Sequence, residues 1–120
     1  MADYFSQGLV GAGIFEFDID SRGFPINKRL FGVSRFGSPD GLHTDDYGRV
    51  WTGESDGIVV RNKNGQIIGI FNQLTLKDQK IAGAIAQLSL AEDTLIIFAQ
   101  TRLWRIQLAQ TVKKGGSAGN

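Results

Sequence analysis

The sequence contains no cysteine, only two prolines and no long apolar segment. The absence of cysteine excludes a disulfide framework, a thiol nucleophile and every cysteine-ligated metal site. No apolar run approaches the roughly 18 residues that a membrane-spanning helix needs, so we expect no membrane segment. The first residues also lack the basic start and the apolar core of a secretory signal. We therefore expect a soluble protein, and its compartment, cytoplasmic or secreted, stays open.

An excess of charge of one sign is also lacking. The 120 residues carry 13 basic and 12 acidic side chains, a net charge of +1, without blocks of basic residues. This balance gives no electrostatic reason to expect nucleic acid or an anionic membrane surface as a partner. The length fits one domain, and 42% hydrophobic residues suffice for a buried core.

Glycine, in contrast, is abundant, with 16 residues scattered along the chain. Between the glycines, short segments alternate apolar and polar residues, which is the pattern of half-buried β-strands. Asn64-Gly65 between two extended segments predicts a hairpin. We expect strands at residues 15–20, 29–33, 42–44, 50–52, 58–60, 66–71, 85–90, 94–99 and 103–108. Residues 74–84 are interpreted mainly as a loop.

The strands repeat at a nearly fixed interval. Gly13 and Gly57 begin similar segments 44 residues apart, and Arg102 begins a third one 45 residues after Gly57. Propeller blades repeat at roughly this interval, and a closed ring needs at least about four blades. The expected strands group as two, four and three. The sequence therefore predicts an all-β fold, a partial β-propeller of about two to two-and-a-half antiparallel blades, which is an arc and not a ring.

This organisation divides the chain into three parts. Residues 1–12 form an N-terminal segment of undetermined structure, and residues 13–110 form the propeller region. Residues 111–120 are polar and rich in glycine, so we expect a disordered tail.

One stretch is specific enough to suggest a family. Residues 39–51 read P-D-G-L-x-x-D-x-x-G-x-V-W and are followed by D-G-I-V-V at 56–60 and N-G-Q-I-I-G at 64–69. The last strands read T-L-I-I-F-A-Q-T-R-L-W-R-I-Q-L. Over residues 14–108 the chain resembles the C-terminal part of the gluconolactonase, senescence-marker and luciferin-regenerating family.

This resemblance implies a six-bladed propeller with one divalent cation on its axis and hydrolysis of sugar or aldonic lactones. Asp40 matches the aspartate that serves the family as metal ligand and proposed general base. Calcium is the first expectation for the cation, with zinc, manganese or magnesium as alternatives. The other family ligands, a glutamate and an asparagine, have no counterpart here, because the chain starts after the point where that asparagine lies. The resemblance therefore implies a fragment that is not active alone.

Several residues near Asp40 allow two interpretations. His43 is a candidate for orienting substrate or water, or else it is a half-buried strand residue. Asp45 and Asp46 either enlarge an acidic patch or fix the turn before Val50. The tryptophans at 51 and 104 either stack on a sugar or pack in a core.

Two further motifs match known sites only in part. Residues 53–57 fit G-x-S-x-G, but a strand follows where the hydrolase nucleophile elbow needs a helix, so we interpret Ser55 as a turn residue. Residues 18–23 begin like a calcium loop, yet Arg29 stands where the loop needs a glutamate, which again favours a turn.

A second function class stays open, a non-catalytic propeller-type module that binds ligands or partners. In both classes the open ends of an arc expose strand edges, which template association. We expect self-association through the two ends, near Phe15, Phe17, Leu103 and Trp104.

Overall fold

The computed structural model describes residues 12–34, 39–55, 57–72, 85–99 and 102–114, and these residues form antiparallel sheets only. Their strands are β1 (Gly13–Ile19), β2 (Pro25–Val33), β3 (Leu42–Thr44), β4 (Val50–Glu54), β5 (Gly57–Arg61), β6 (Ile67–Phe71), β7 (Ile85–Ala91), β8 (Thr94–Ala99) and β9 (Arg102–Gln107). They make a two-stranded sheet β1-β2, a four-stranded sheet β3-β4-β5-β6 and a three-stranded sheet β7-β8-β9. The predicted grouping of two, four and three is confirmed.

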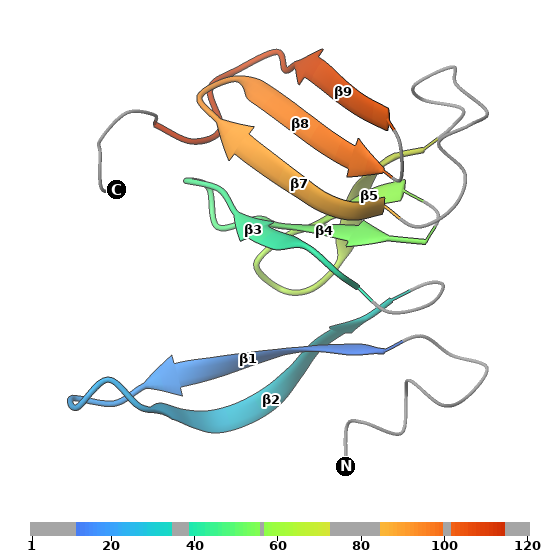
Figure 1. The fold of residues 1–120 in the computed structure, drawn as a ribbon. Helices are drawn as coiled ribbons and strands as arrows, with labels where there is room; N and C mark the ends of the chain where they lie inside the picture. Colours follow the sequence, from blue (N-terminus) through green and yellow to red (C-terminus); the bar gives the residue numbers. More distant parts are fainter. Residues whose placement is uncertain (1–11, 35–38, 56, 73–84, 100–101, 115–120) are drawn as a thin grey trace.

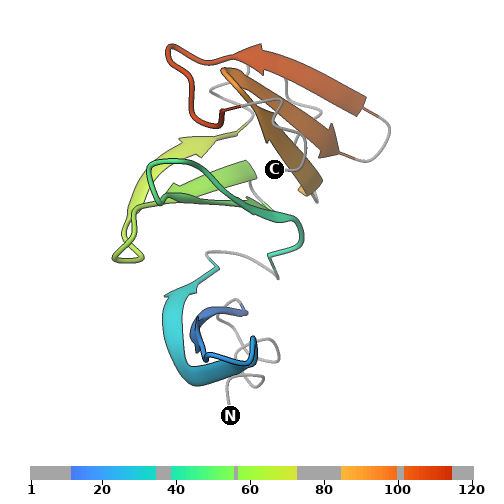
Figure 2. The same cartoon turned by 90° about the vertical axis from the view of Figure 1, so that its left-hand side faces the viewer.

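The three sheets follow one another through the molecule like consecutive blades. The β1–β2 hairpin lies at one end, the β3–β6 sheet in the middle and the β7–β9 sheet at the other end (Figures 1 and 2). β3 and β8 have the predicted bounds, whereas β2 begins at Pro25 and not at residue 29. Pro25 occupies the first position of the strand, where proline is tolerated. Asn27 has a positive φ of 56° and lies beside a register shift between β1 and β2, so a bulge bends β2 at this point.

Three hairpin turns share one construction. In each turn, a side-chain oxygen of the first residue accepts hydrogen bonds from the backbone N–H groups two and four residues later. The first residues are Asp20, Asp45 and Asn62, and a glycine with φ between 80° and 90° stands three residues after each: Gly23, Gly48 and Gly65. Because glycine alone adopts such a φ without strain, the D/N-x-x-G pattern specifies the turn. The interpretation of residues 18–23 as a turn is confirmed.

The apolar core lies between the middle sheet and the β7–β9 sheet. Its buried members are Trp51, Ile58, Val60, Leu88, Leu90, Leu95, Ile97 and Val112. Trp51 is only 4% exposed and stacks on Phe71 with ring centroids 5.8 Å apart. Trp104 is partly buried against the same cluster. Both tryptophans are therefore packing residues, which was the second of the two interpretations.

The opposite face of the middle sheet is held to the β1–β2 sheet by polar groups. Arg61 Nη1 donates hydrogen bonds to Glu54 Oε2 at 2.7 Å and to Thr52 Oγ1 at 3.1 Å, and all three side chains are buried. Thr52 Oγ1 donates to Glu54 Oε2 at 2.6 Å. Arg61 Nη2 reaches the neighbouring sheet and donates to Val33 O at 3.0 Å. One charged cluster thus joins β4 and β5 to β2.

Gly65 should be the position at which the contact between the middle sheet and the β1–β2 sheet is most sensitive to an added methyl group. It has a φ of +86°, and a Cβ there would meet the carbonyl oxygen of Phe31 on β2. We expect Gly65→Ala to lower the free energy of unfolding by about 2 kcal/mol, measured by urea denaturation. Gly23→Ala is the matched control, because Gly23 has a φ of +90° with nothing within 4 Å of its added Cβ. Equal losses in the two variants would show that the contact with Phe31 contributes nothing.

The predicted tail is in part folded. Val112 is 3% exposed, its N–H donates to Glu92 O, and its carbonyl accepts from Asp46 N at 2.8 Å. Residues 112–114 thus connect the middle sheet to the β7–β9 sheet in the structure. The structure does not describe three of the predicted segments: residues 1–11, the predicted loop 74–84 and residues 115–120.

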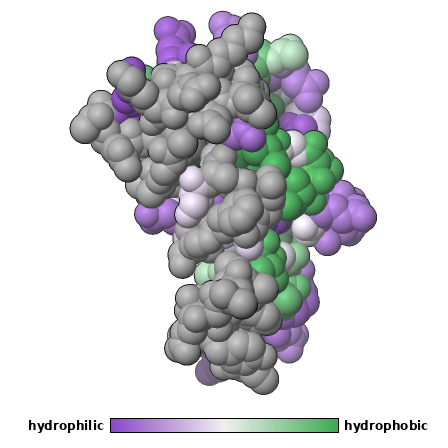
Figure 3. All heavy atoms as spheres, turned by 90° about the vertical axis from the view of Figure 1, so that its right-hand side faces the viewer, coloured by the Kyte–Doolittle hydropathy of each residue, from purple (hydrophilic) through white to green (hydrophobic). Residues whose placement is uncertain are grey.

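Figure 3 shows apolar side chains at the surface in the middle and the lower part of one face. Phe17 on β1 and Leu103 on β9 are exposed, and Phe15 and Trp104 are half-buried. Self-association through these ends stays a prediction. In the described part of the chain, the structure contains no helix with the length and apolarity to cross a membrane.

Candidate functional site

Asp40 is exposed and lies two residues before β3, an edge strand of the middle sheet. Its backbone N–H donates to Gly53 O at 2.9 Å, while Gly53 N donates to Gly41 O at 2.9 Å. Two successive residues, Asp40 and Gly41, thus face the single residue Gly53, which is the arrangement of a β-bulge. Bulges redirect a side chain at the end of a strand and are frequent beside functional sites.

Gly41 brings this bulge against the next sheet. A Cβ on Gly41 would lie 2.5 Å from Oε1 and 3.0 Å from Cα of Gln87, so only glycine allows this approach. Gln87 belongs to β7, which is the edge strand of its own sheet. The edge strands of two adjacent sheets therefore converge beside Asp40, as inner strands converge on the axis of a propeller.

Gln87 is the functional candidate that sequence reasoning missed. Its side chain is exposed and lies against Gly41, so it brings an amide oxygen and an amide N–H to the Asp40 end of β3. The available signal was a polar residue inside the apolar strand I-A-Q-L-S-L-A. That signal was weak, because alternating strands carry polar residues regularly and nothing in the sequence places β7 beside Asp40.

His43 is half-buried on β3 and pairs with Trp51 across the ladder. Cross-strand partners point to the same face, so His43 lies on the face that packs against the β7–β9 sheet. Among the residues that the structure describes, no hydrogen bond joins the side chains of His43 and Asp40. A role of His43 in binding substrate stays a prediction.

Asp45 is a structural carboxylate. Its Oδ1 accepts from the N–H groups of Tyr47 and Arg49 at 2.9 and 3.0 Å, and its Oδ2 accepts from Arg49 Nε at 2.6 Å and Trp51 Nε1 at 2.9 Å. Burial by itself would raise the pKa of Asp45, but the hydrogen bonds from Trp51 and Arg49 outweigh it and lower that pKa. Asp45 therefore fixes the turn before Val50, and its filled oxygens have no room for a cation.

The donor set around Asp40 is small. No group of three or more histidine, aspartate or glutamate side chains suited to a metal ion occurs among the described residues. Asp46 Oδ2 accepts from the N–H of Lys114 at 2.7 Å, so it ties down the C-terminal segment. Gln87, which lies against Gly41, brings one further side-chain oxygen close to the Asp40 end of β3.

Ser55 is not placed like a hydrolase nucleophile. It lies in the tight turn between β4 and β5, and a strand follows it where a hydrolase nucleophile would need a helix. The interpretation as a turn serine is confirmed.

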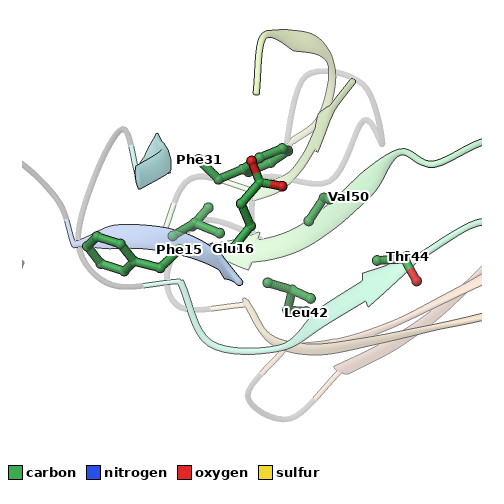
Figure 4. A pocket seen from close by; sticks show the side chains of 7 residues that line it. Phe15, Glu16, Phe31, Leu42, Thr44 and Val50 are labelled. Carbon is green, nitrogen blue, oxygen red and sulfur yellow. The ribbon is translucent and has the colours of Figure 1, made fainter. Parts of the chain in front are cut away.

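A pocket of about 230 Å³ lies between the first two sheets, and Asp40 is not one of its lining residues. It is lined by Ile14, Phe15, Glu16, Phe31, Leu42, Thr44 and Val50. Figure 4 shows Glu16 and Phe31 on one side and Leu42, Thr44 and Val50 on the other. Apart from Glu16 and Thr44, the lining residues are apolar, so the pocket is suited to an apolar group and not to a sugar.

Two solved structures share this arrangement of strands. A gluconolactonase from Xanthomonas campestris, described as important in glucose secondary metabolic pathways, superposes with a TM-score of 0.69 at 23% identity over 81% of this chain and 30% of its own. A putative gluconolactonase solved by a structural genomics consortium superposes with a TM-score of 0.70 at 19% identity over 84% of this chain and 33% of its own.

These matches confirm the predicted fold and the likeness to gluconolactonases at the level of structure. The described residues have the all-β fold of part of a propeller-type lactonase, and the chain spans about a third of the proteins that it matches. No family model matches the sequence, and no curated protein sequence matches it.

Proposed function

We propose that this chain belongs to a metal-dependent, propeller-type lactonase that hydrolyses sugar or aldonic lactones, and that Asp40 is its catalytic carboxylate. The observation that carries the proposal is the position of Asp40 on a bulge where the edge strands β3 and β7 converge. The gluconolactonase-like fold over about four fifths of the chain supports it.

The chemistry requires a base beside an ester carbonyl. Asp40 accepts the proton of a water molecule whose oxygen bonds to the lactone carbonyl carbon. The ring C–O bond then breaks, and the proton passes from Asp40 to the leaving alkoxide. Gln87, beside Gly41, orients the lactone through its amide N–H.

A divalent cation, when bound, would polarise the lactone carbonyl, and carboxylate and amide oxygens suit calcium or magnesium, while zinc and manganese also accept them. The described residues do not form a complete site for it, because they contain no group of three acidic or histidine donors. Asp40 supplies one oxygen and Gln87 a second at most. The remaining donors must come from outside the described residues.

A lactonase assay tests this proposal. Hydrolysis of glucono-1,5-lactone is followed by base consumption with added calcium, zinc or manganese, for this chain and for a longer version that includes upstream sequence. We expect turnover barely above buffer for this chain and clear turnover for the longer version. Asp40→Asn in the longer version should lower kcat by about 100-fold or more, because it removes the general base.

Asp46→Asn is the matched control, since Asp46 is an exposed carboxylate on the same hairpin and is bonded to Lys114 N. It should leave kcat unchanged. A silent longer version, or equal effects of the two substitutions, would contradict the proposal.

The small donor set favours one alternative, a non-catalytic propeller-type binding module. Thermal melting of the longer version with and without millimolar calcium separates the two. A cation bound to the folded state raises the melting temperature, and a binding module without a metal site shows no shift.

A further inference from the structure

The turn between β5 and β6 carries an asparagine whose side chain is not held in place. Asn64 is exposed, and its side chain makes no hydrogen bond to any residue that the structure describes. Two other asparagines in hairpins differ from it. Asn27 Nδ2 donates to Asp18 Oδ2 at 3.0 Å, and Asn62 Oδ1 accepts from two backbone N–H groups of its own turn. The side-chain amide of Asn64 is therefore free to rotate in water.

Glycine follows Asn64, and this pair of residues allows a covalent reaction. The backbone nitrogen of Gly65 attacks the side-chain carbonyl carbon of Asn64 and closes a five-membered succinimide ring. The carbon–nitrogen bond of the side-chain amide breaks, and ammonia leaves with the proton of the Gly65 N–H. Water then opens the ring at one of its two carbonyl carbons, which gives an aspartyl or an isoaspartyl residue. Glycine has no side chain to hinder the attack, and Asn64-Gly65 is the only Asn-Gly pair in the sequence.

The hydrogen bonds of the turn control when this reaction starts. The Gly65 N–H donates to Asn62 O at 2.9 Å. Asn62 Oδ1 accepts from the N–H groups of Asn64 and Gln66 at 2.9 and 3.0 Å and closes the turn. Because the Gly65 N–H must leave its acceptor before the nitrogen can attack, the reaction follows a local opening of the turn.

The same turn packs against β2 without space for another main-chain atom. Gly65 has a φ of +86°, and a Cβ there would meet the carbonyl oxygen of Phe31. A Cβ on Gly32 would lie 3.0 Å from Arg61 Nε and 3.8 Å from Gly65 O, so glycines on both sides permit the close approach. An isoaspartyl residue routes the main chain through its side chain and lengthens it by one carbon before Gly65. The isoaspartyl product therefore displaces Gly65 from its place against β2.

We propose that Asn64 is a site of spontaneous succinimide formation with Gly65, and that the isoaspartyl product releases the β1–β2 sheet from the middle sheet. The reaction consumes only water, so it sets how long the contact between the two sheets lasts. The aspartyl product keeps the original main chain and leaves the contact in place. The proposal does not depend on lactonase activity, and both sides of the contact lie within the described residues.

Ageing of the full chain at pH 8 and 37 °C tests the covalent step. Tryptic peptide mapping with tandem mass spectrometry follows the mass increase that accompanies the exchange of NH2 for OH. We expect this increase at Asn64 well before any increase at Asn27 or Asn62, which are each followed by lysine. The rate should fall at pH 6, because the attack needs a deprotonated nitrogen. Asn64→Gln is the blocked variant, since glutamine forms its larger imide ring far more slowly, and it should show no increase at this position.

Two substitutions of Asn62 test the control by the turn. Asn62→Ala removes the acceptor of two N–H groups and should speed the reaction about fivefold, the factor expected for one net hydrogen bond. Asn62→Asp is the matched control, since Asp20 and Asp45 close turns of the same construction, and its rate should equal that of the unchanged chain. If Asn62→Ala does not fold, urea gives the second measurement. The rate in the unchanged chain should rise with urea below the unfolding midpoint.

Hydrogen exchange of β2 tests the release of the sheet. A two-stranded hairpin is only marginally stable by itself, so the amide groups of β2 should lose protection once the contact is broken. Ion exchange separates the reacted chain from the unreacted chain, and peptide mapping gives its isoaspartyl fraction. We expect a fast-exchanging fraction of residues 25–33 that equals this isoaspartyl fraction. Asn64→Asp carries the same added charge on an unaltered main chain, and its β2 should exchange like that of the unreacted chain.

Three results would overturn the proposal. The first is a mass increase at Asn64 that comes no earlier than at Asn27 and Asn62. The second is a rate that neither Asn62→Ala nor low urea raises. The third is protection of β2 that survives in the isoaspartyl chain, or that Asn64→Asp loses equally, because the altered main chain would then not be what releases the sheet.

Discussion

Replacing Arg61 by methionine should lower the free energy of unfolding by about 3 to 5 kcal/mol. The Arg61 and Glu54 side chains are 1% and 0% exposed, and their ion pair is 2.7 Å long. The substitution removes the cation that is paired with a buried carboxylate, and it removes the hydrogen bond from Arg61 Nη2 to Val33 O. Urea denaturation followed by tryptophan fluorescence measures the loss.

Two further variants separate charge from shape at this position. The double variant Glu54→Leu with Arg61→Met should recover much of the loss, because replacing a buried ion pair by apolar side chains is often close to neutral. Arg61→Lys keeps the charge but not the planar fork that reaches three acceptors, so its loss should be smaller than that of Arg61→Met. A double variant as unstable as Arg61→Met would contradict this explanation.

Replacing Asp45 by alanine should cost about 3 kcal/mol, because hydrogen bonds to a charged group are the strong ones. The Asp45 side chain is fully buried, and it accepts from two backbone N–H groups and from the side chains of Arg49 and Trp51. Arg49 Nη2 is already buried without a hydrogen-bond partner among the described residues. Alanine would therefore leave the Arg49 Nε and the indole N–H without their acceptor. Chemical denaturation at pH 7 measures the loss.

Asp45→Asn is the matched control, since Asn62 shows that an asparagine closes the same kind of turn. It should cost less than alanine and remove one part of the pH dependence. The pKa of Asp45 is lower in the folded chain than its ordinary value of about 3.9. The contribution of Asp45 to the free energy of unfolding is therefore complete above about pH 4, and it is lost as the pH falls through the lowered pKa. An unchanged acid-induced loss of stability in Asp45→Asn would contradict this assignment.

The grouping of strands was predictable because local patterns determine it. Asp20, Asp45 and Asn62 each stand three residues before a glycine, and each pattern marks a hairpin turn without help from distant residues. The 44-residue interval between Gly13 and Gly57 then indicated which strands are equivalent. The turn pattern acts within one hairpin and the interval within one repeat, so neither depends on how distant segments of the chain pack.

The contacts between sheets were not predictable in the same way. Arg61 reaches Val33, 28 residues away, and nothing in G-I-V-V-R distinguishes an arginine that joins two sheets from one that faces solvent. Gln87 was missed for the same reason, since its place beside Gly41 depends on how two sheets meet. Asp40 was found only through the P-D-G-L motif. Its position at converging edges agrees with the predicted role, and that role awaits the lactonase assay.

The two faces of the middle sheet have different consequences for the rigidity of the arc. Apolar contacts on the Trp51 face depend little on direction and tolerate small rotations of one sheet over the other. The bonds of Arg61 to Glu54, Thr52 and Val33 require fixed angles, so they orient the first hairpin relative to the middle sheet. The pocket between the first two sheets thereby keeps a constant width. A group that enters it loses its own freedom on binding but does not have to order the walls of the pocket.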